Sequence, residues 1–315
     1  MIASMNTPAS KSTEPSAPIA PAPAQTLAVP AEPSPSPLAT GAQGATAAEA
    51  IARALAEPAR TAEEAVARPL ILVVHASVGS GHRSAANAIA EALEEAGEAA
   101  RAAGDDNSLE ARSEVRVLDI LDFGRIVFDG DKTASMFTGW TRPFYDLTWR
   151  YTLTGRLLWG GGTIWARLMY PKFTEYVRRL RPAAIVATHI TAANVAVSAR
   201  MITGQSFPIV CVPTDYEAEG LWPHLHTDLF CVANESMAET LRPRRVPEDR
   251  ILITGIPASP AFSRTYDRAK AREAFGLPQD KQVVLALAGA KLPQPYVHFR
   301  AAIGEMLPFM HAMPS

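Results

Sequence analysis

From residue 69 onward, short apolar runs alternate with amphipathic segments. Leu70–Val74 is apolar throughout and rich in β-branched residues, which is typical of a strand buried on both faces of a parallel sheet. The Ala-, Leu- and Glu-rich segment 84–96 predicts a helix. The same patterns predict further strands at 115–120, 184–187, 208–212, 229–232 and 251–254, and helices at 191–203 and 235–241. We therefore expect βαβ crossovers and an α/β fold with a doubly wound, Rossmann-like parallel sheet.

Polar residues that directly follow these strands are candidate ligand-binding residues, because open α/β sheets bind ligands beyond the carboxyl ends of their strands. The first strand is followed by Gly79, Ser80, Gly81, His82 and Arg83. The glycines permit a sharp turn, and the positive end of the next helix suits an anionic or oxyanionic group. His82 would act as a general base near neutral pH if a carboxylate orients it.

The glycine spacing lacks the Gly-Lys-Ser/Thr of a P-loop and the third glycine of a dinucleotide-binding fingerprint. A glycine-rich turn with a capping histidine therefore remains the alternative interpretation of this loop.

Two later loops carry further candidates. Thr214 and Asp215 follow the strand that ends near Val212, where Asp215 would orient His82 or a substrate hydroxyl, or would simply cap a turn or helix. His189 follows the strand at 184–187 and would line the same crevice, unless Thr191 only caps the next helix. His224 and His226 lack a further ligand set, so we expect no metal.

Residues 136–173 combine aromatic side chains with a local excess of positive charge. They include four of the five tryptophans and five cationic residues against one acidic residue. This combination is typical of a segment that lies on an anionic bilayer surface, and the alternative is an aromatic pair of core helices. Gly160–Gly162 would divide the segment into two helices and allow a mobile flap. The residues that we expect to contact lipid are Trp140, Arg142, Trp149, Arg150, Trp159 and Trp165.

Charge and composition narrow the remaining function classes. With 30 Lys and Arg against 32 Asp and Glu, the chain lacks the basic excess of a dedicated nucleic-acid binder. Cys211 and Cys231 are too few for a disulfide framework and lie in apolar runs, which suits buried, reduced thiols in the cytoplasm. No apolar run reaches the ~18 residues of a membrane span, and no secretory signal is recognisable.

The beginning of the chain differs in composition from the rest. Residues 1–40 hold nine of the 26 prolines and are otherwise mostly Ala, Ser and Thr. Such a segment buries too little apolar surface to offset its ordering entropy. We expect residues 1–68 to form a disordered, Ala- and Pro-rich tail, with some transient helix at 45–67, and the folded region to start near Pro69.

Four stretches in a fixed order resemble a known family. They are Gly79–Ala86, Val212–Asp215, Thr227–Glu235, and Thr254–Pro257 followed by Pro260–Phe262. Over about residues 70–290 the chain is similar to the monogalactosyldiacylglycerol synthases and processive diacylglycerol glucosyltransferases. These are inverting glycosyltransferases of the two-lobed GT-B type, related to the peptidoglycan enzyme MurG.

The resemblance implies a peripheral protein on the inner face of the cell membrane that moves a hexose from a UDP-sugar to diacylglycerol. His82 would deprotonate the acceptor hydroxyl with the help of Asp215, and the hydroxyl would attack the anomeric carbon opposite UDP without a metal. The residues implied in acceptor binding are Gly79, Ser80, Gly81, Arg83, His189 and Thr214.

The resemblance also divides the chain. Residues 69–258 would form the acceptor- and membrane-binding lobe, and residues 259–315 an interdomain segment with the start of the donor lobe, whose first strand we expect at 283–287. A complete donor lobe would need on the order of 100 further residues. We therefore expect poor turnover from this chain alone: either it is a truncated product or fragment, or another polypeptide supplies the donor lobe. The alternatives are a non-catalytic fragment that binds a lipid surface and, more weakly supported, a related enzyme with a soluble acceptor.

Overall fold

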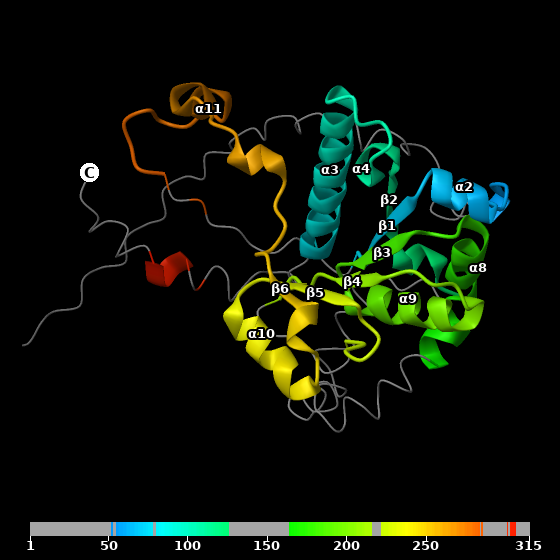
Figure 1. The fold of residues 1–315 in the computed structure, drawn as a ribbon. Helices are drawn as coiled ribbons and strands as arrows, with labels where there is room; N and C mark the ends of the chain where they lie inside the picture. The colour runs from blue at the N-terminus through cyan, green and yellow to red at the C-terminus, as the bar shows by residue number, and fades with distance from the viewer. Residues whose placement is uncertain are drawn as a thin grey trace, which may run out of the picture. The chain divides into compact units, whose positions relative to one another are not determined.

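A six-stranded, all-parallel sheet forms the centre of the described part of the chain (Figure 1). In this computed structural model the described residues are 52, 55–77, 80–125, 164–215, 222–283, 285, 301 and 303–306. The strand order is β2-β1-β3-β4-β5-β6. The strands are β1 (Leu70–His75), β2 (Glu114–Asp119), β3 (Ala184–Ala187), β4 (Ile209–Cys211), β5 (Leu229–Val232) and β6 (Ile251–Ile253). The six strands predicted between residues 70 and 254 are therefore confirmed to within one or two residues at each end.

Helices cover both faces of the sheet, which confirms the doubly wound arrangement. In Figure 1, α3 (Ser80–Ala102) lies on one side of the strands, and α8 (Pro171–Leu180) and α9 (Ile190–Thr203) lie on the other. Contacts connect α3 to β1 and β2, α8 to α9, and α10 (Glu235–Leu241) to β5 and β6. The sequence patterns did not predict α8, nor the short helices α4 (Leu109–Arg112) and α11 (Arg268–Ala274).

Local signals account for the ends of several helices. Pro171 occupies the first turn of α8, where its missing N–H costs no hydrogen bond. Arg181 follows α8 with a φ of 49°, and Gly204 follows α9 with a φ of 65°. Both residues end their helices in the left-handed conformation, which glycine adopts without strain.

The core lies mainly between the sheet and the α8–α9 layer. Leu70, Leu72 and Val74 of β1 are fully buried there against Phe173 and Tyr176 of α8. Burial of each such side chain contributes about 1.5–3 kcal/mol. Buried alanines near the start of α3 let that helix approach the other face of β1 and β2 closely.

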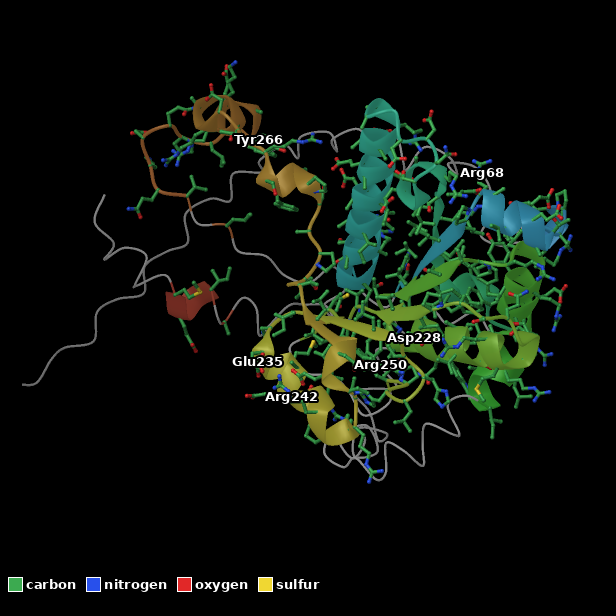
Figure 2. All side chains as sticks on the ribbon, viewed as in Figure 1. Arg68, Asp228, Glu235, Arg242, Arg250 and Tyr266 are labelled. Atoms are coloured by element: carbon green, nitrogen blue, oxygen red, sulfur yellow. The ribbon has the colours of Figure 1, made fainter. Side chains whose placement is uncertain are left out.

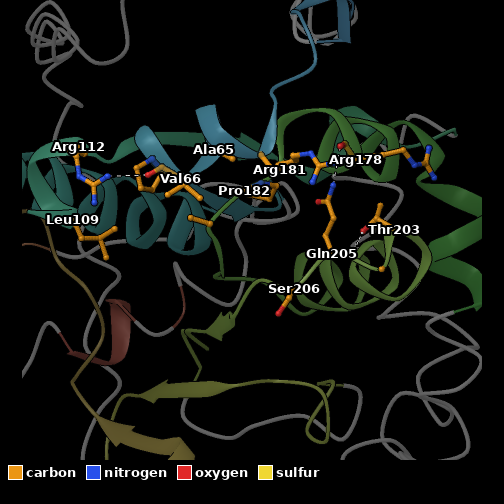
Figure 3. A pocket seen from close by; sticks show the side chains of 14 residues that line it. Ala65, Val66, Leu109, Arg112, Arg178, Arg181, Pro182, Thr203, Gln205 and Ser206 are labelled. Atoms are coloured by element: carbon orange, nitrogen blue, oxygen red, sulfur yellow. Dashed lines mark hydrogen bonds between the residues drawn. The ribbon is translucent and has the colours of Figure 1, made fainter. Parts of the chain in front are cut away.

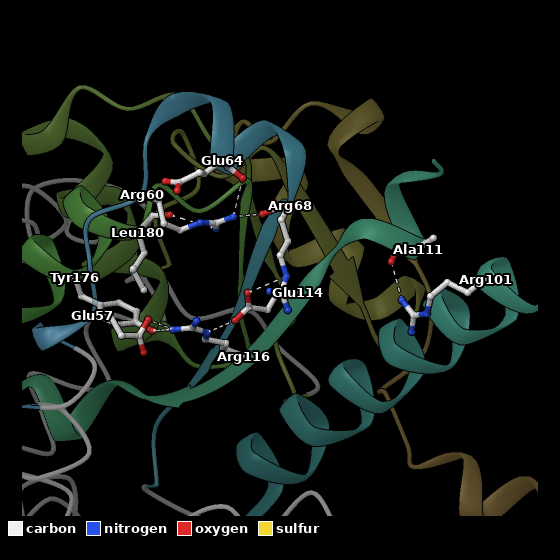
Figure 4. Close-up of polar contacts among 10 residues, drawn as sticks. All are labelled: Glu57, Arg60, Glu64, Arg68, Arg101, Ala111, Glu114, Arg116, Tyr176 and Leu180. Atoms are coloured by element: carbon white, nitrogen blue, oxygen red, sulfur yellow. Dashed lines mark hydrogen bonds and ion pairs between the residues drawn. The ribbon is translucent and has the colours of Figure 1, made fainter. Parts of the chain in front are cut away.

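The ordered structure extends N-terminal of Pro69, where we expected the folded region to begin. Helix α2 (Ala62–Ala67) starts with a capping box made by Thr61 and Glu64. Figure 4 shows how arginines attach this segment to the sheet. Arg116 on β2 binds the Glu57 carboxylate at 2.8 Å, and Arg179 donates to the Glu57 backbone oxygen at 2.6 Å. These long-range partners supply the ordering energy that local composition lacks.

The chain beyond β5 is held by polar contacts. Arg242, at the end of α10, pairs with Glu235 at 2.6 Å (Figure 2). It also pairs with Glu248 at 2.9 Å. After β6, Ser259 donates to Glu91 of α3 at 2.9 Å. Residues 283 and 285 are not in a strand, and the other residues of the strand expected at 283–287 lie outside the described ranges. The division at residue 258 stays a prediction.

Two further expectations concern thiols and membrane spans. Cys211 and Cys231 are both free thiols; Cys211 is buried and Cys231 is partly buried. Burial raises the pKa of the Cys211 thiol to about 12, so it stays protonated. In the ranges that the structure describes, no helix combines the length and apolarity that crossing a bilayer requires.

Candidate functional site

The strand order makes the carboxyl ends of β1 and β3 a topological switch point, where a ligand crevice is expected in a doubly wound sheet. The chain passes from β1 to β2 on one side and then returns to place β3 on the other side of β1. The loops that leave β1 and β3 therefore diverge, and such a switch point is where doubly wound sheets bind ligands. Ser80, Gly81 and Arg83 are exposed in the first turn of α3 at this edge, whereas Gly79 lies outside the described residues.

His82 is where three of the predicted loops meet. Its Nδ1 lies 3.0 Å from the backbone oxygen of Thr188, which follows β3. The same nitrogen lies 2.9 Å from the hydroxyl oxygen of Thr214, which follows β4. In return, the Thr188 hydroxyl donates to the backbone oxygen of His82 at 2.9 Å. A backbone oxygen after β3 and a side chain after β4 thus hold the imidazole of a residue that follows β1.

These contacts assign the tautomer of His82. A carbonyl oxygen only accepts hydrogen bonds, so the hydrogen between Nδ1 and Thr188 must be on Nδ1. In the neutral ring Nε2 then carries the lone pair. Among the described residues, none makes a hydrogen bond to Nε2. Nε2 is therefore the ring nitrogen that is able to accept a proton.

His189 stands edge-on to His82, with ring centroids 4.6 Å apart and an interplanar angle of 84°. Its Nδ1 accepts the backbone N–H of Thr191 at 3.1 Å, so His189 itself caps α9 and the expectation of a Thr191 cap was wrong. Burial, with smaller contributions from His82 and His75, lowers the pKa of His189 to about 3. His189 is therefore neutral at physiological pH and carries its hydrogen on Nε2.

His75 and Asp119 belong to the same edge and were not predicted. They end β1 and β2 and are paired in register. His75 is only 5% exposed, and burial lowers its pKa although Asp119 opposes the shift. The Asp119 carboxylate accepts the backbone N–H groups of Ser77, at 3.3 Å, and Leu121, at 3.0 Å. Asp119 thereby ties the loop after β1 to the end of β2. The sequence did offer a signal for both residues, because each is a polar residue at the end of a predicted strand.

Thr214 occupies the place that we expected for Asp215. The Thr214 hydroxyl contacts the His82 ring, whereas the Asp215 side chain is exposed and makes no hydrogen bond to His82 in the described part of the chain. Which of two consecutive residues points at the ring depends on the backbone after β4, which the residue pattern does not specify. A catalytic role for Asp215 stays a prediction.

The aromatic and basic segment is described only in part. Trp140, Arg142, Trp149, Arg150 and Trp159 lie outside the described residues. Trp165 is 40% exposed, and its helical neighbours Ile164 and Leu168 are 63% and 58% exposed. Tyr170 and Phe173 are instead buried in the core. The core interpretation therefore holds for Tyr170 and Phe173, and an apolar stripe of Ile164, Trp165 and Leu168 remains on the surface.

A second hollow lies at the opposite edge of the sheet (Figure 3). It has a volume of about 760 Å³, and its lining includes Pro69, Pro182 and Ser206, which precede β1, β3 and β4. Arg112 reaches into this region and donates to the backbone oxygens of Val66 and Ala67, at 3.0 and 3.3 Å. Cations beside the carboxyl ends of helices offset the negative end of the helix dipole. This hollow is separate from the His82 crevice.

The described residues do not form a cluster of metal ligands. Within the described ranges, no group of three or more His, Cys, Asp or Glu side chains is placed to hold a metal ion. His224 is buried and stacks on Phe230 with ring centroids 5.8 Å apart. The absence of a metal requirement stays a prediction.

Comparison with known proteins gives a family. Residues 82–258 match the family described as Monogalactosyldiacylglycerol (MGDG) synthase. The chain is 28% identical over 127 residues to the processive diacylglycerol beta-glucosyltransferase of Bacillus licheniformis. That alignment covers 40% of this chain and 33% of the relative. It is 31% identical over 91 residues to the Bacillus subtilis protein of that name, in an alignment that covers 29% of this chain and 24% of the relative. The chain thus matches a third or less of the length of these curated relatives.

Among solved structures, the apo form of the lipopolysaccharide outer core galactosyltransferase WaaB is similar at a TM-score of 0.33 and 12% identity. That similarity covers 59% of this chain and 44% of the other. The family match begins at His82, includes Thr188, His189 and Thr214, and ends after β6. Because this match takes in more than half of the residues, the chain belongs to the monogalactosyldiacylglycerol synthase family.

Proposed function

We propose that this chain forms the acceptor-binding lobe of a glycosyltransferase that moves a hexose from a UDP-sugar to a diacylglycerol hydroxyl. Membership of the family and the names of the Bacillus relatives support the reaction class. The observation that carries the proposal is the His82 ring, whose Nδ1 is engaged by Thr188 and Thr214 at the switch-point crevice. That engagement leaves Nε2 as a base for the acceptor hydroxyl.

In the proposed reaction, Nε2 of His82 takes the proton of the acceptor hydroxyl. The hydroxyl oxygen forms a bond to the anomeric carbon while the bond from that carbon to the UDP oxygen breaks, and the electron pair leaves with UDP. One displacement from the opposite face inverts the anomeric centre. A neutral imidazole suits this step because its free ring nitrogen accepts a proton, and a rigid strand-to-helix junction fixes its direction.

Two neighbours would assist His82. His189 remains neutral, so it adds no positive charge beside the base and offers an N–H to an oxygen in the crevice. Helix α3 has no acidic residue in its first turn. Its positive end would therefore stabilise negative charge that develops on the acceptor oxygen.

The donor half of the reaction is assigned to a second lobe. All six described strands belong to one sheet, and in this proposal the described residues around it would supply only the acceptor side of the site. In this proposal residues 69–258 are the acceptor lobe, and residues 259–315 lead toward the lobe that binds the UDP-sugar. The identity of the hexose would depend on that lobe.

A transfer assay tests the proposal. The chain, alone and fused to the C-terminal part of the Bacillus subtilis relative, is mixed with radiolabelled UDP-glucose or UDP-galactose and diacylglycerol vesicles. We expect labelled glycolipid from the fusion. His82→Ala should lower kcat by about 10²- to 10⁴-fold with a nearly unchanged KM for diacylglycerol. His226→Ala, which removes an imidazole from the β4–β5 loop, is the matched control. An unchanged rate in the His82→Ala fusion would remove His82 from the chemistry.

The exposed stripe supports contact with an anionic membrane. Ile164, Trp165 and Leu168 present apolar surface beside the exposed Arg167, a combination that binds the interface of acidic bilayers. We expect the protein to sediment with phosphatidylglycerol vesicles and less with phosphatidylcholine vesicles. A Trp165→Ala/Leu168→Ala variant should bind several-fold more weakly, whereas Met201→Ala, an exposed apolar residue on α9, should not. Equal binding by all three proteins would argue against this surface.

A further inference from the structure

The His82 ring is held without a carboxylate in the described part of the chain. A histidine ring has two tautomers and rotates broadly about its last side-chain torsion. Only the tautomer with hydrogen on Nδ1 leaves Nε2 basic. The two groups that select it here are neutral acceptors from different loops, the Thr188 backbone oxygen and the Thr214 hydroxyl.

Thr188 fixes the distance between β3 and the first turn of α3. Its side chain is fully buried. Its N–H donates to the Val74 oxygen of β1 at 3.0 Å, and its hydroxyl donates to the His82 backbone oxygen at 2.9 Å. Its own backbone oxygen then receives the ring hydrogen at 3.0 Å. Residue 188 and residue 82 thus hold each other through two reciprocal hydrogen bonds.

Thr214 closes the arrangement from β4. Its hydroxyl oxygen lies 2.9 Å from Nδ1. Because Nδ1 carries the hydrogen toward Thr188, the Thr214 oxygen accepts and its own hydrogen turns elsewhere. Two acceptors on one N–H restrict rotation of the ring more than one acceptor does. Neither acceptor changes its charge when the ring gains a proton, so the direction of Nε2 is kept through a proton-transfer step.

We propose that Thr188 and Thr214 form a clamp that locks His82 in the Nδ1–H tautomer with Nε2 directed into the crevice. Both are positioning residues that act through His82. This inference rests on the proposed function for its catalytic meaning, but the tautomer itself is a property of the chain that is measurable without any substrate. The clamp gives Thr214 a different role from the one expected from the sequence, which was to bind the acceptor.

The first test is nitrogen-15 NMR of the full chain labelled at histidine, without donor or acceptor. We expect the His82 signals of the wild type to show hydrogen on Nδ1. Thr214→Val, which keeps the shape and removes the acceptor, should shift the ring toward the other tautomer, and Thr214→Ser should restore it. Thr203→Val removes a hydroxyl at the carboxyl end of α9 that bonds to the backbone of Ala199 and Gln205, and it should change nothing at His82.

The spectra separate failure of the clamp from failure of the proposed function. Wild-type His82 with hydrogen on Nε2 would overturn both the clamp and the role of Nε2 as base. Identical spectra of wild type and Thr214→Val would overturn the part of Thr214 in the clamp and leave the base intact. A chain that shows the expected tautomer but never transfers a sugar would keep the clamp and refute the reaction.

The second test is kinetic, in the active fusion. Thr214→Val should lower kcat by about tenfold, as expected for loss of one hydrogen bond to the ring. Its KM for diacylglycerol should stay within about twofold, and Thr214→Ser should recover most of the rate. A raised KM with unchanged kcat would show Thr214 to be an acceptor-binding residue and would overturn the clamp.

Thr188 is tested in the same way with an added check of folding. Thr188→Val leaves the His82 backbone oxygen without its donor, and we expect both the tautomer and the unfolding temperature to change. Thr188→Ser keeps the hydroxyl and should return the wild-type tautomer. If the serine variant folds but shows the tautomer of the valine variant, the Thr188 hydroxyl is not part of the clamp.

Discussion

Arg116 attaches the segment before β1 to the rest of the fold, and its replacement tests how that segment is held. The guanidinium donates to Glu114 at 2.6 Å, to Glu57 at 2.8 Å and to the hydroxyl of Tyr176 at 3.2 Å (Figure 4). The perturbation is Arg116→Met, which keeps most of the side-chain packing and removes all three hydrogen bonds.

The structure sets the expected magnitude. A shielded hydrogen bond to a charged group contributes about 1.5–3 kcal/mol, and an exposed ion pair about 0–1 kcal/mol. The side chains of Arg116, Glu57 and Glu114 are 29%, 34% and 23% exposed. We therefore take an intermediate contribution of about 1 kcal/mol to the free energy of unfolding for each of the two ion pairs. The buried Tyr176 hydroxyl, left without its donor, adds up to about 1 kcal/mol. We expect the free energy of unfolding to fall by about 2–3 kcal/mol.

The assay is urea unfolding of the full chain, followed by circular dichroism, with the midpoint and slope fitted together. Limited proteolysis near residues 57–61 should accelerate in the variant, because the segment loses its partner on β2. The matched control is Arg178→Met, which removes an exposed pair with Glu175 and should cost less than about 0.5 kcal/mol. A loss below about 0.5 kcal/mol in Arg116→Met as well would show that the segment is held by apolar contacts instead.

The remaining predictions concern His189 and one helix contact. The pKa of His189 is about 3 in the fold and ordinarily about 6.5 when unfolded. Between pH 3 and pH 6.5 the unfolded chain therefore binds a proton that the folded chain does not bind. The free energy of unfolding should be unaffected by this proton above pH 6.5, and below that pH it should fall by up to about 1.4 kcal/mol for each pH unit down to pH 3. His189→Asn keeps a capping side chain and should flatten the pH dependence measured by urea unfolding; an unaltered slope would contradict the burial argument. Gly97→Ala places a Cβ 2.8 Å from the Glu110 backbone oxygen, so thermal unfolding should occur several degrees lower despite the better helix propensity; a higher melting temperature would show that α4 yields at no cost.

Elements with a strong local pattern were predictable. Strands β3 and β5 occur where the residue pattern placed them, because strands buried on both faces are continuous apolar runs. Helix α8 was missed, although Pro171 and the amphipathic spacing were available as signals. The aromatic content of residues 136–173 drew attention to lipid contact, and only packing separates the buried Tyr170 and Phe173 from the exposed Trp165.

The candidate site was predictable to the level of loops and not of atoms. The carboxyl ends of the strands identified His82, His189 and Thr214 as neighbours in one crevice, since parallel strands end at the same edge. The pairing of His82 with Thr214 instead of Asp215 depends on the backbone direction after β4. The partnership of His75 with Asp119 depends on the register between β1 and β2.

By itself, the sequence determined the succession of strands and helices and placed a glycine-flanked histidine at a strand-to-helix junction. Those features follow from local burial patterns and backbone preferences. Only the tertiary structure decided the strand order and thereby which residues, 106 and 132 positions from His82, would meet its ring. The physical reason is that hydrogen-bond partners across such distances are selected by how helices pack on the sheet, and no local stretch of sequence specifies that packing.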